Sequence, residues 1–196
     1  MSLPPEAQAV LDFWFLPTDH FQHGHYRLEW FRKDDAFDAT IREQFGAQVE
    51  LVLAGGLAAW DATPHGALAR ILLLDQFTRN IFRNTPRAFA GDMLALDAAQ
   101  RMVAMGTDKQ LGAILRWFVY LPFEHSEALA MQEQSMALFR DLQATAGKPL
   151  CSALDYADRH HQVIARFGRF PHRNAILGRE STPEEIEALK QPGFFF

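Results

Sequence analysis

The 196-residue chain has one cysteine, Cys151, and only four lysines against 15 arginines. One cysteine cannot form an intramolecular disulfide, so we expect a reducing compartment and a cytoplasmic location. The N-terminus lacks the basic start and apolar run of a secretory signal, and the longest apolar runs are far shorter than a membrane span. The sequence therefore predicts a soluble protein with no membrane partner.

The common cofactor and metal motifs are also missing. No glycine-rich stretch matches the Walker or dinucleotide-binding patterns. The stretch DHFQHGH, residues 19–25, brings three histidines and an aspartate together, but no matching cysteine or carboxylate cluster follows downstream. We interpret this stretch as a polar surface loop, and we expect neither a metal nor another cofactor.

Helical periodicity runs through most of the chain, and no stretch shows the sustained apolar–polar alternation of a half-buried strand. The connections are too short for an interdomain linker and suit antiparallel helical hairpins. We predict an all-α protein with one domain over residues 1–196. About eight helices are expected, near residues 4–15, 35–55, 62–82, 91–105, 108–118, 122–143 and 150–167 and after Thr182.

Several residues are typical of helix ends. Thr63 is a candidate N-cap, and Gly168 suits the position just after a helix. Capping boxes, in which a threonine and a residue three positions later bond reciprocally, are predicted at Thr107–Gln110 and at Thr182–Glu185.

Arginine is concentrated in two segments, although the net charge is −5. Residues 70–90 hold four arginines and one acid, and residues 159–179 hold five arginines and no acid. Arginine is well suited to bidentate, partly buried contacts with carboxylate or phosphate. The acidic total argues against a nucleic-acid partner, because such surfaces are usually strongly basic.

The first polar motif is LLLDQFTRNIFR, residues 72–83. Asp75, Arg79 and Arg83 recur every four residues, which places them on one helical face. Two arginines four residues apart repel each other by about 0.2–0.5 kcal/mol in an isolated helix. We therefore expect a negative group near Arg83, either a carboxylate from another helix or a bound anion.

The second polar motif is LPFEHSEAL, residues 121–129. Pro122 is expected in the first turn of a helix, where its missing N–H is tolerated. His125 then shares an inward stripe with Leu121 and Leu129, either as a hydrogen-bonded core residue or as a site residue. Glu124 becomes a general acid or base if burial raises its pKa.

The third polar motif is ARFGRFPHRN, residues 165–174. A turn stiffened by Pro171 should hold Arg169, His172, Arg173 and Asn174 in fixed directions. Hydrogen-bond donors on a stiff turn suit either the carbonyl groups at helix ends or an oxyanion. The sequence leaves both interpretations open.

The order of the motifs in this chain closely resembles that of an uncharacterised bacterial family, domain of unknown function 924. VLDFWF and WFRKDDAFDATIREQF come before the first two polar motifs, and RFGRFPHRNAILGRESTPEE comes last. The resemblance covers about Val10 to Leu189. It implies an all-helical fold similar to the right-handed superhelices of tetratricopeptide repeats. It implies no established activity or substrate.

We expect an arginine-rich pocket that binds a small anionic or polar ligand and is a candidate enzyme site. Glu124 and His125 are the catalytic candidates, and the ligand-binding candidates are Asp75, Arg79, Arg83, Arg169, His172, Arg173 and Asn174.

The alternative is a non-catalytic scaffold that binds a protein or peptide partner through exposed aromatic side chains. The candidates are Trp30, Phe31, Trp60, Trp117 and Tyr120. The apolar C-terminus QPGFFF is expected to dock on the body of the protein or on a second copy, which makes a homodimer an alternative to a monomer.

Overall fold

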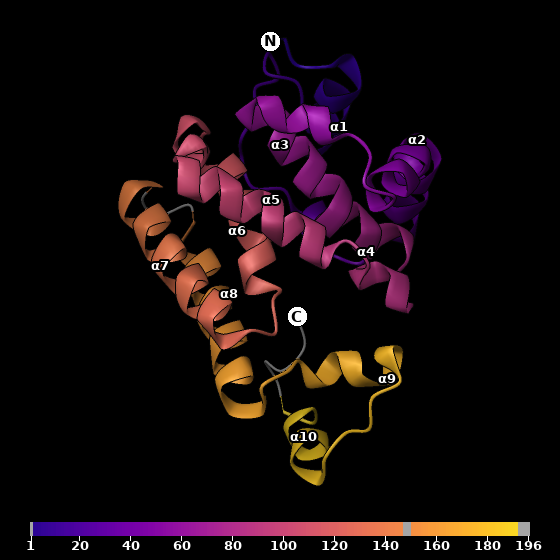
Figure 1. Cartoon of the computed structure of the whole chain (residues 1–196), viewed down its shortest axis with the longest axis vertical. Helices are drawn as coiled ribbons and strands as arrows, with labels where there is room; N and C mark the ends of the chain where they lie inside the picture. The colour runs from indigo at the N-terminus through magenta and orange to yellow at the C-terminus, as the bar shows by residue number, and fades with distance from the viewer. Residues whose placement is uncertain (1, 147–149, 192–196) are drawn as a thin grey trace. The chain divides into compact units, whose positions relative to one another are not determined.

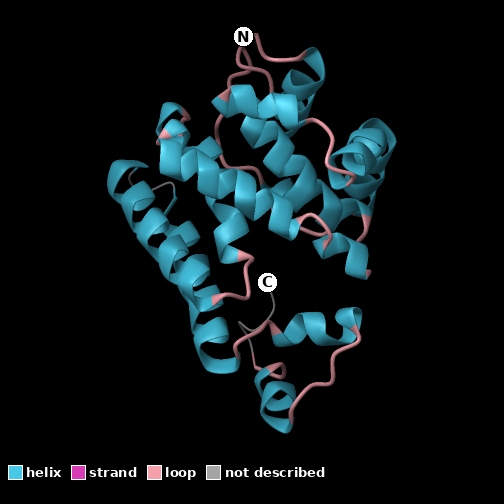
Figure 2. Cartoon of the chain, viewed as in Figure 1, coloured by secondary structure: helices cyan, strands magenta, loops and turns pink. Residues whose placement is uncertain are grey.

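The computed structural model describes residues 2–146 and 150–191, apart from the side chain of Cys151. Within these ranges the regular elements are all helical and none is a strand (Figure 2), which confirms the all-α prediction. The C-terminal phenylalanines, Phe194–Phe196, lie outside the described residues.

The chain divides into two compact units. The first comprises Met1–Arg83 and Arg87–Pro122, and the second comprises Asn84–Pro86 and Phe123–Phe196. The prediction of one domain with a superhelical arrangement stays a prediction.

The first unit is built around α3 (Pro64–Ile71), which continues through the π-helical turn η3 (Leu72–Phe77) into α4 (Thr78–Ile81) (Figure 1). Nearly all side chains of this helical run are buried. α1 and α5 pack against α3, and α2 packs along η3 and α4. The other helices of this part of the chain are α1 (Pro5–Phe15), α2 (Asp35–Leu53), α5 (Asp92–Met105) and α6 (Ala113–Glu124), with 3-10 turns η1 (Leu28–Trp30), η2 (Ala58–Ala62), η4 (Pro86–Phe89) and η5 (Thr107–Gln110).

The second unit is organised by two long helices, α7 (Leu129–Ala146) and α8 (Cys151–Phe167), which lie side by side (Figure 1). Val163 and Ile164 of α8 form a small buried cluster with Phe170, and Phe167 packs against it. Short helical elements follow: η7 (Pro171–Arg173), α9 (Asn174–Leu177) and α10 (Pro183–Ala188).

Three of the predicted helix ends are confirmed. The Thr63 side chain accepts a hydrogen bond from the Gly66 backbone N–H and caps α3. Gly168 ends α8 with φ 68°, a left-handed conformation that glycine adopts without strain. Thr182 and Glu185 form both bonds of a capping box at α10.

The capping box predicted at Thr107–Gln110 is wrong. These residues form only a 3-10 turn without a side-chain cap, and the Thr107 hydroxyl donates to the Met102 carbonyl instead. A 3-10 turn of four residues is too short to contain the i→i+4 hydrogen bonds of an α-helix. The reciprocal bonds of a capping box therefore do not form here.

Pro122 was expected to begin a helix, but it lies inside α6, close to the end of that helix at Glu124. α6 runs to Glu124 and α7 begins only at Leu129, so the predicted helices at 108–118 and 122–143 have wrong boundaries. Burial explains the difference, because α6 is buried along almost its whole length and this packing outweighs the hydrogen bond that Pro122 cannot donate. His125 consequently lies in a turn and not on a helical stripe.

Candidate functional site

Arg79 in the first unit has two carboxylate partners. Its Nη1 lies 3.1 Å from Asp75 Oδ1 and donates to Asp92 Oδ1 over 2.8 Å, while Nη2 donates to Asp92 Oδ2 over 3.1 Å. Burial disfavours the charged guanidinium, but Asp75 and Asp92 together raise the pKa of Arg79. The charge of Arg79 is therefore balanced within the protein.

Arg83 lies beyond the end of α4 and forms a bidentate ion pair with Asp38 of α2. Nε donates to Oδ2 over 2.8 Å and Nη2 donates to Oδ1 over 2.9 Å. The Asn80 amide also donates to Asp38 Oδ1, over 2.7 Å. We expected either a carboxylate from another helix or a bound anion near Arg83, and the structure shows the carboxylate.

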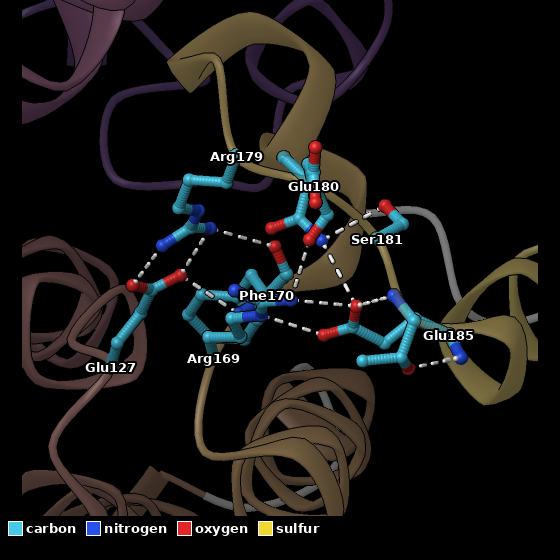
Figure 3. Close-up of polar contacts among 9 residues, drawn as sticks. Glu127, Arg169, Phe170, Arg179, Glu180, Ser181 and Glu185 are labelled. Carbon is cyan, nitrogen blue, oxygen red and sulfur yellow. Dashed lines mark hydrogen bonds and ion pairs between the residues drawn. The ribbon is translucent and has the colours of Figure 1, made fainter.

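Arg169 in the second unit is held by Glu185 in the same bidentate manner (Figure 3). Nε donates to Oε1 over 2.6 Å and Nη2 donates to Oε2 over 2.8 Å, and Nη2 also donates to the Glu180 carbonyl. The Asn174 amide donates to the Ser181 hydroxyl and to Glu185. Hydrogen bonds from Arg169, the largest cause, hold the pKa of Glu185 at about 2.

Glu127 fixes the other side of the same turn (Figure 3). Its carboxylate accepts the Phe170 backbone N–H over 2.8 Å and both terminal nitrogens of Arg179, over 2.7 and 2.9 Å. Arg179 Nη2 also donates to the Phe170 carbonyl. Burial would raise the pKa of Glu127, but the hydrogen bonds from Arg179 and Phe170 lower it. The turn after α8 is thus tied to two carboxylates.

A carboxylate–imidazole contact lies buried in the second unit. Glu124 Oε1 is 3.1 Å from His160 Nδ1, and the two side chains are 4% and 5% exposed. The same nitrogen lies 2.8 Å from the Tyr156 carbonyl. A carbonyl oxygen can only accept, so Nδ1 carries the hydrogen and Nε2 carries the lone pair when His160 is neutral.

The rings of His160 and His172 and the guanidinium of Arg173 lie around the ring of Phe170, and His125 lies next to His160. The His160 and Phe170 rings are 5.5 Å apart, as are those of Phe170 and His172, and the Arg173 guanidinium lies 4.4 Å above the Phe170 ring. The His125 ring is 6.2 Å from His160. We call Glu124, His125, His160, His172 and Arg173 the histidine cluster.

The histidines His160 and His172 of this cluster are held in the neutral form. Burial lowers the pKa of His160 well below its usual value, and His125 and Arg173 lower it further. Burial also lowers the pKa of His172 to about 4, with Arg173 as the next cause and Glu127 acting in the opposite direction. Neutral imidazoles therefore lie beside permanent positive charge at neutral pH.

The residues predicted to form one site belong to two sets, one in each unit. A single pocket lined by both sets stays a prediction. Within the second unit, Glu124, His125, His172 and Arg173 lie in the histidine cluster, while Arg169 and Asn174 bond to Glu185. The set in the first unit comprises Asp75, Arg79 and Arg83.

His160, Glu127 and Arg179 were not singled out from the sequence. His160 is 4% exposed, whereas the neighbouring His161 is partly exposed. Positions Ala153, Ala157 and His160, spaced by four and three, carry the helical signal that would have found His160. Glu127 and Arg179 are 52 positions apart, and no local pattern links them.

The histidine-rich stretch near the N-terminus bonds locally. His20 Nδ1 accepts from the Gln22 backbone N–H, and His23 Nδ1 lies 2.6 Å from the Leu16 carbonyl. Among residues 2–146 and 150–191, no group of three or more histidine, cysteine or acidic residues is arranged to hold a metal ion. Over the same residues, every helix is too short or too polar to cross a membrane.

Comparison with known proteins places this all-helical chain in a protein family whose members share sequence and fold and whose activity is unknown. A family model described as bacterial protein of unknown function (DUF924) matches residues 10–193, and the chain belongs to this family. A solved structure of a protein of unknown function from Agrobacterium tumefaciens is similar, with 38% identity and a TM-score of 0.81, covering 94% of this chain and 96% of that one. No curated protein matches.

Proposed function

We propose that the second unit binds a small anionic or polar ligand at the histidine cluster. His160 accepts a proton there, and Glu124 fixes its tautomer. The observation that carries the proposal is the 3.1 Å contact between two almost completely buried ionisable side chains. Burying such groups costs free energy that an apolar pair would not cost. Ionisable groups with strongly shifted pKa values are concentrated at functional sites.

His160 is the proposed base. Its Nδ1–H points at the Tyr156 carbonyl and the Glu124 carboxylate, which leaves the lone pair on Nε2. A carboxylate beside Nδ1 fixes this tautomer and stabilises the imidazolium that forms when Nε2 accepts a proton. Because burial lowers the pKa of His160, Nε2 carries no proton at neutral pH.

Positive charge around His172 favours an anionic ligand. Arg173, His125 and Arg179 each lower its pKa, and only Glu127 raises it. A bound anion would oppose these effects and raise the pKa of His172 and His160. Ligand binding should therefore be accompanied by proton uptake below neutral pH.

In this proposal, the arginines outside the cluster and Asn174 have structural roles. Arg169 and Asn174 hold the turn through Glu185, and the turn presents His172 and Arg173. In the first unit, the charges of Arg79 and Arg83 are met by carboxylates, which favours a structural role for them.

A thermal-shift screen tests the proposal. Acetate, pyruvate, inorganic phosphate and small phosphate esters are each added to the parent protein and to the His125→Gln and His172→Gln variants. A ligand at 100 times its Kd should stabilise the parent by about 2.7 kcal/mol and each variant by much less. His161→Gln on α8 is the matched control and should respond as the parent does. Equal stabilisation of all four proteins, or of none, would refute the site.

A second candidate is a helical scaffold for a protein or peptide, with the tetratricopeptide-like superhelix as its framework. The observation that favours it is a group of exposed apolar side chains in residues 21–31. Phe21 is 82% exposed, Leu28 67%, Phe31 49% and Tyr26 45%. Selection of apolar peptides from a phage library by the parent, lost in Phe31→Ser, would support this candidate, and no selection would oppose it.

Most of the aromatic residues first assigned to that role are not available for it. Phe31 is exposed, but the other four are each 6% exposed or less and pack in the core: Trp30, Trp60, Trp117 and Tyr120. Helical spacing alone does not separate an aromatic side chain that faces the core from one that faces a partner.

A further inference from the structure

The segment between α1 and α2 is fastened to the end of α1 by its own side chains. Arg27 Nη1 donates to the Phe13 and Trp14 carbonyls, each over 2.8 Å, and Trp30 Nε1 donates to the Trp14 carbonyl over 2.9 Å. The last carbonyls of a helix have no partner within the helix, so these bonds cap α1. Because Arg27 and Trp30 are both fixed, the backbone around them is held in place.

Three apolar side chains of this fastened segment are exposed. Tyr26 is 45% exposed, Leu28 67% and Phe31 49%. The Tyr26 and Phe31 rings are nearly parallel, with centroids 5.9 Å apart, and both stack on the buried Trp117, at 6.2 and 5.2 Å. We call Tyr26, Leu28 and Phe31 the aromatic patch.

The aromatic patch has the properties of a protein interface. Its three side chains expose on the order of 300 Å² of apolar surface, comparable to the largest patch of a typical monomer, and such patches are often interaction sites. Aromatic residues are enriched in interfaces relative to the rest of a protein surface. A surface that is already held in one conformation loses little entropy on association, so the bonds from Arg27 and Trp30 favour binding.

The charges that follow the aromatic patch in the chain indicate what the partner is. Arg32 and Lys33 are directly followed by Asp34 and Asp35, and all four residues are exposed. Lys33 Nζ lies 3.5 Å from Asp35 Oδ1, and these two side chains are 64% and 85% exposed. A strongly acidic or strongly basic partner would meet like charges here, which weakens binding. The balanced charges favour a partner whose surface is balanced in the same way.

A second copy of the chain is such a partner. In a two-fold symmetric dimer the same surface lies on both sides, so a contact from residue i to residue j is matched by one from j to i. Lys33 of each copy can then face Asp35 of the other, while the two aromatic patches cover each other. The chain has a net charge of −5, so two copies repel each other overall and can approach best through a surface with balanced charges.

We propose that the aromatic patch is the interface of a homodimer, with the patch of each copy at its centre and Lys33 and Asp35 at its edge. The proposal rests on the second candidate function, which assigns a protein partner to this region, and it names that partner. It does not depend on the histidine cluster.

Sedimentation equilibrium over protein concentrations of about 5–500 µM tests the proposal. The interface is smaller than a standard one, so we expect a weak dimer with a Kd of about 10–100 µM. Phe31→Ser should raise this Kd at least about tenfold, because it removes an aromatic side chain from the centre of the interface. Met93→Ser is the matched control and should dimerise as the parent does, because Met93 is 75% exposed on α5, outside the patch. A parent that stays monomeric over this range, or equal Kd values for the parent and Phe31→Ser, would overturn the proposal.

A charge exchange at the edge tests whether the partner is a second copy. In Lys33→Asp and in Asp35→Lys, both edge pairs of a homodimer become like-charged, so each variant alone should dimerise at least about threefold more weakly than the parent. A mixture of the two variants restores two opposite-charge pairs, and native mass spectrometry should show mostly mixed dimers. Mixed dimers no more abundant than the two homodimers together would overturn the proposal.

The same experiments separate this proposal from the function on which it rests. A parent that is monomeric but still selects apolar peptides from a phage library, with selection lost in Phe31→Ser, would refute the second copy and support the second candidate function. A dimer that is lost in Phe31→Ser, without selection of any peptide, would support the second copy alone.

Discussion

Asp38 and Arg83 are 45 positions apart in the chain, yet their side chains form two parallel hydrogen bonds of 2.8 and 2.9 Å. The Asp38 side chain is 10% exposed and the Arg83 side chain is 33% exposed. A further bond from Asn80 makes Asp38 the acceptor for two residues at the end of α4. This carboxylate from α2 therefore holds the end of the long helical run that begins with α3.

Removing Arg83 should destabilise the first unit. Arg83→Met leaves the Asp38 carboxylate without its bidentate partner, and we expect a loss of about 1–3 kcal/mol in the free energy of unfolding. Arg87→Met is the control, because Arg87 and Glu50 are 52% and 57% exposed and such pairs contribute about 0–1 kcal/mol. Urea titrations of both variants measure this difference. Equal losses would show that the Asp38 contact adds nothing beyond a surface pair.

Two glycines should respond to alanine in opposite directions. A Cβ at Gly91 would lie 2.2 Å from the Leu74 carbonyl oxygen, whereas a Cβ at Gly46, inside α2, meets nothing within 4 Å. We expect Gly91→Ala to lose about 1–3 kcal/mol of stability through overpacking. Gly46→Ala should gain about 0.5–1 kcal/mol through helix propensity. Thermal unfolding of the two variants tests this, and a Gly91→Ala variant as stable as the parent would contradict the close contact.

Glu127 should be important for the stability of the second unit. Glu127→Ala removes the acceptor of the Phe170 N–H and of Arg179, and we expect a loss of about 2 kcal/mol. Glu184→Ala is the matched control, because the Arg166–Glu184 pair is 50% and 64% exposed and should contribute less than about 1 kcal/mol. Hydrogen exchange of the amides of residues 169–179 should accelerate only in Glu127→Ala. Unchanged exchange in that variant would contradict the account of Glu127.

His172 should make the protein less stable in acid. Its pKa is about 4 in the folded protein, below the ordinary value of about 6.5. Between pH 6.5 and 4 the unfolded chain takes up a proton that the folded protein does not, so stability falls by up to about 3 kcal/mol as the pH is lowered through this window. His172→Gln should lose less stability than the parent between pH 7 and 4.5 in urea titrations. His25→Gln, at an exposed position, should match the parent, and the same pH dependence in all three proteins would contradict the shift.

Signals within one turn of helix were predictable from the sequence. Thr63, Gly168 and the Thr182–Glu185 box each act through bonds or backbone angles of neighbouring residues, so a short pattern contains the whole interaction. Pro122 shows the limit of such patterns. Its local preference for a first turn was outweighed by the packing of α6, which depends on residues distant in sequence.

The candidate site was only partly predictable for the same reason. Charge and spacing indicated that Arg83 needs a negative partner, but they could not identify Asp38. His125 was predicted on a helix because the start of α7 was misassigned. Charge and spacing also did not indicate His160, which lies next to the partly exposed His161. The partners of a buried charge are chosen by tertiary packing, which one sequence does not display.

The central claim is that His160, neutral and hydrogen-bonded through Nδ1–H, belongs to a site for a small anion. Long-range ¹H–¹⁵N NMR of the eight histidines, at pH 7 with and without inorganic phosphate, tests it most directly. We predict a His160 ring protonated only at Nδ1, and saturable shifts on addition of phosphate for His125, His160 and His172 alone. A His160 protonated at Nε2, or shifts spread equally over all the histidines or absent from the cluster, would contradict the account.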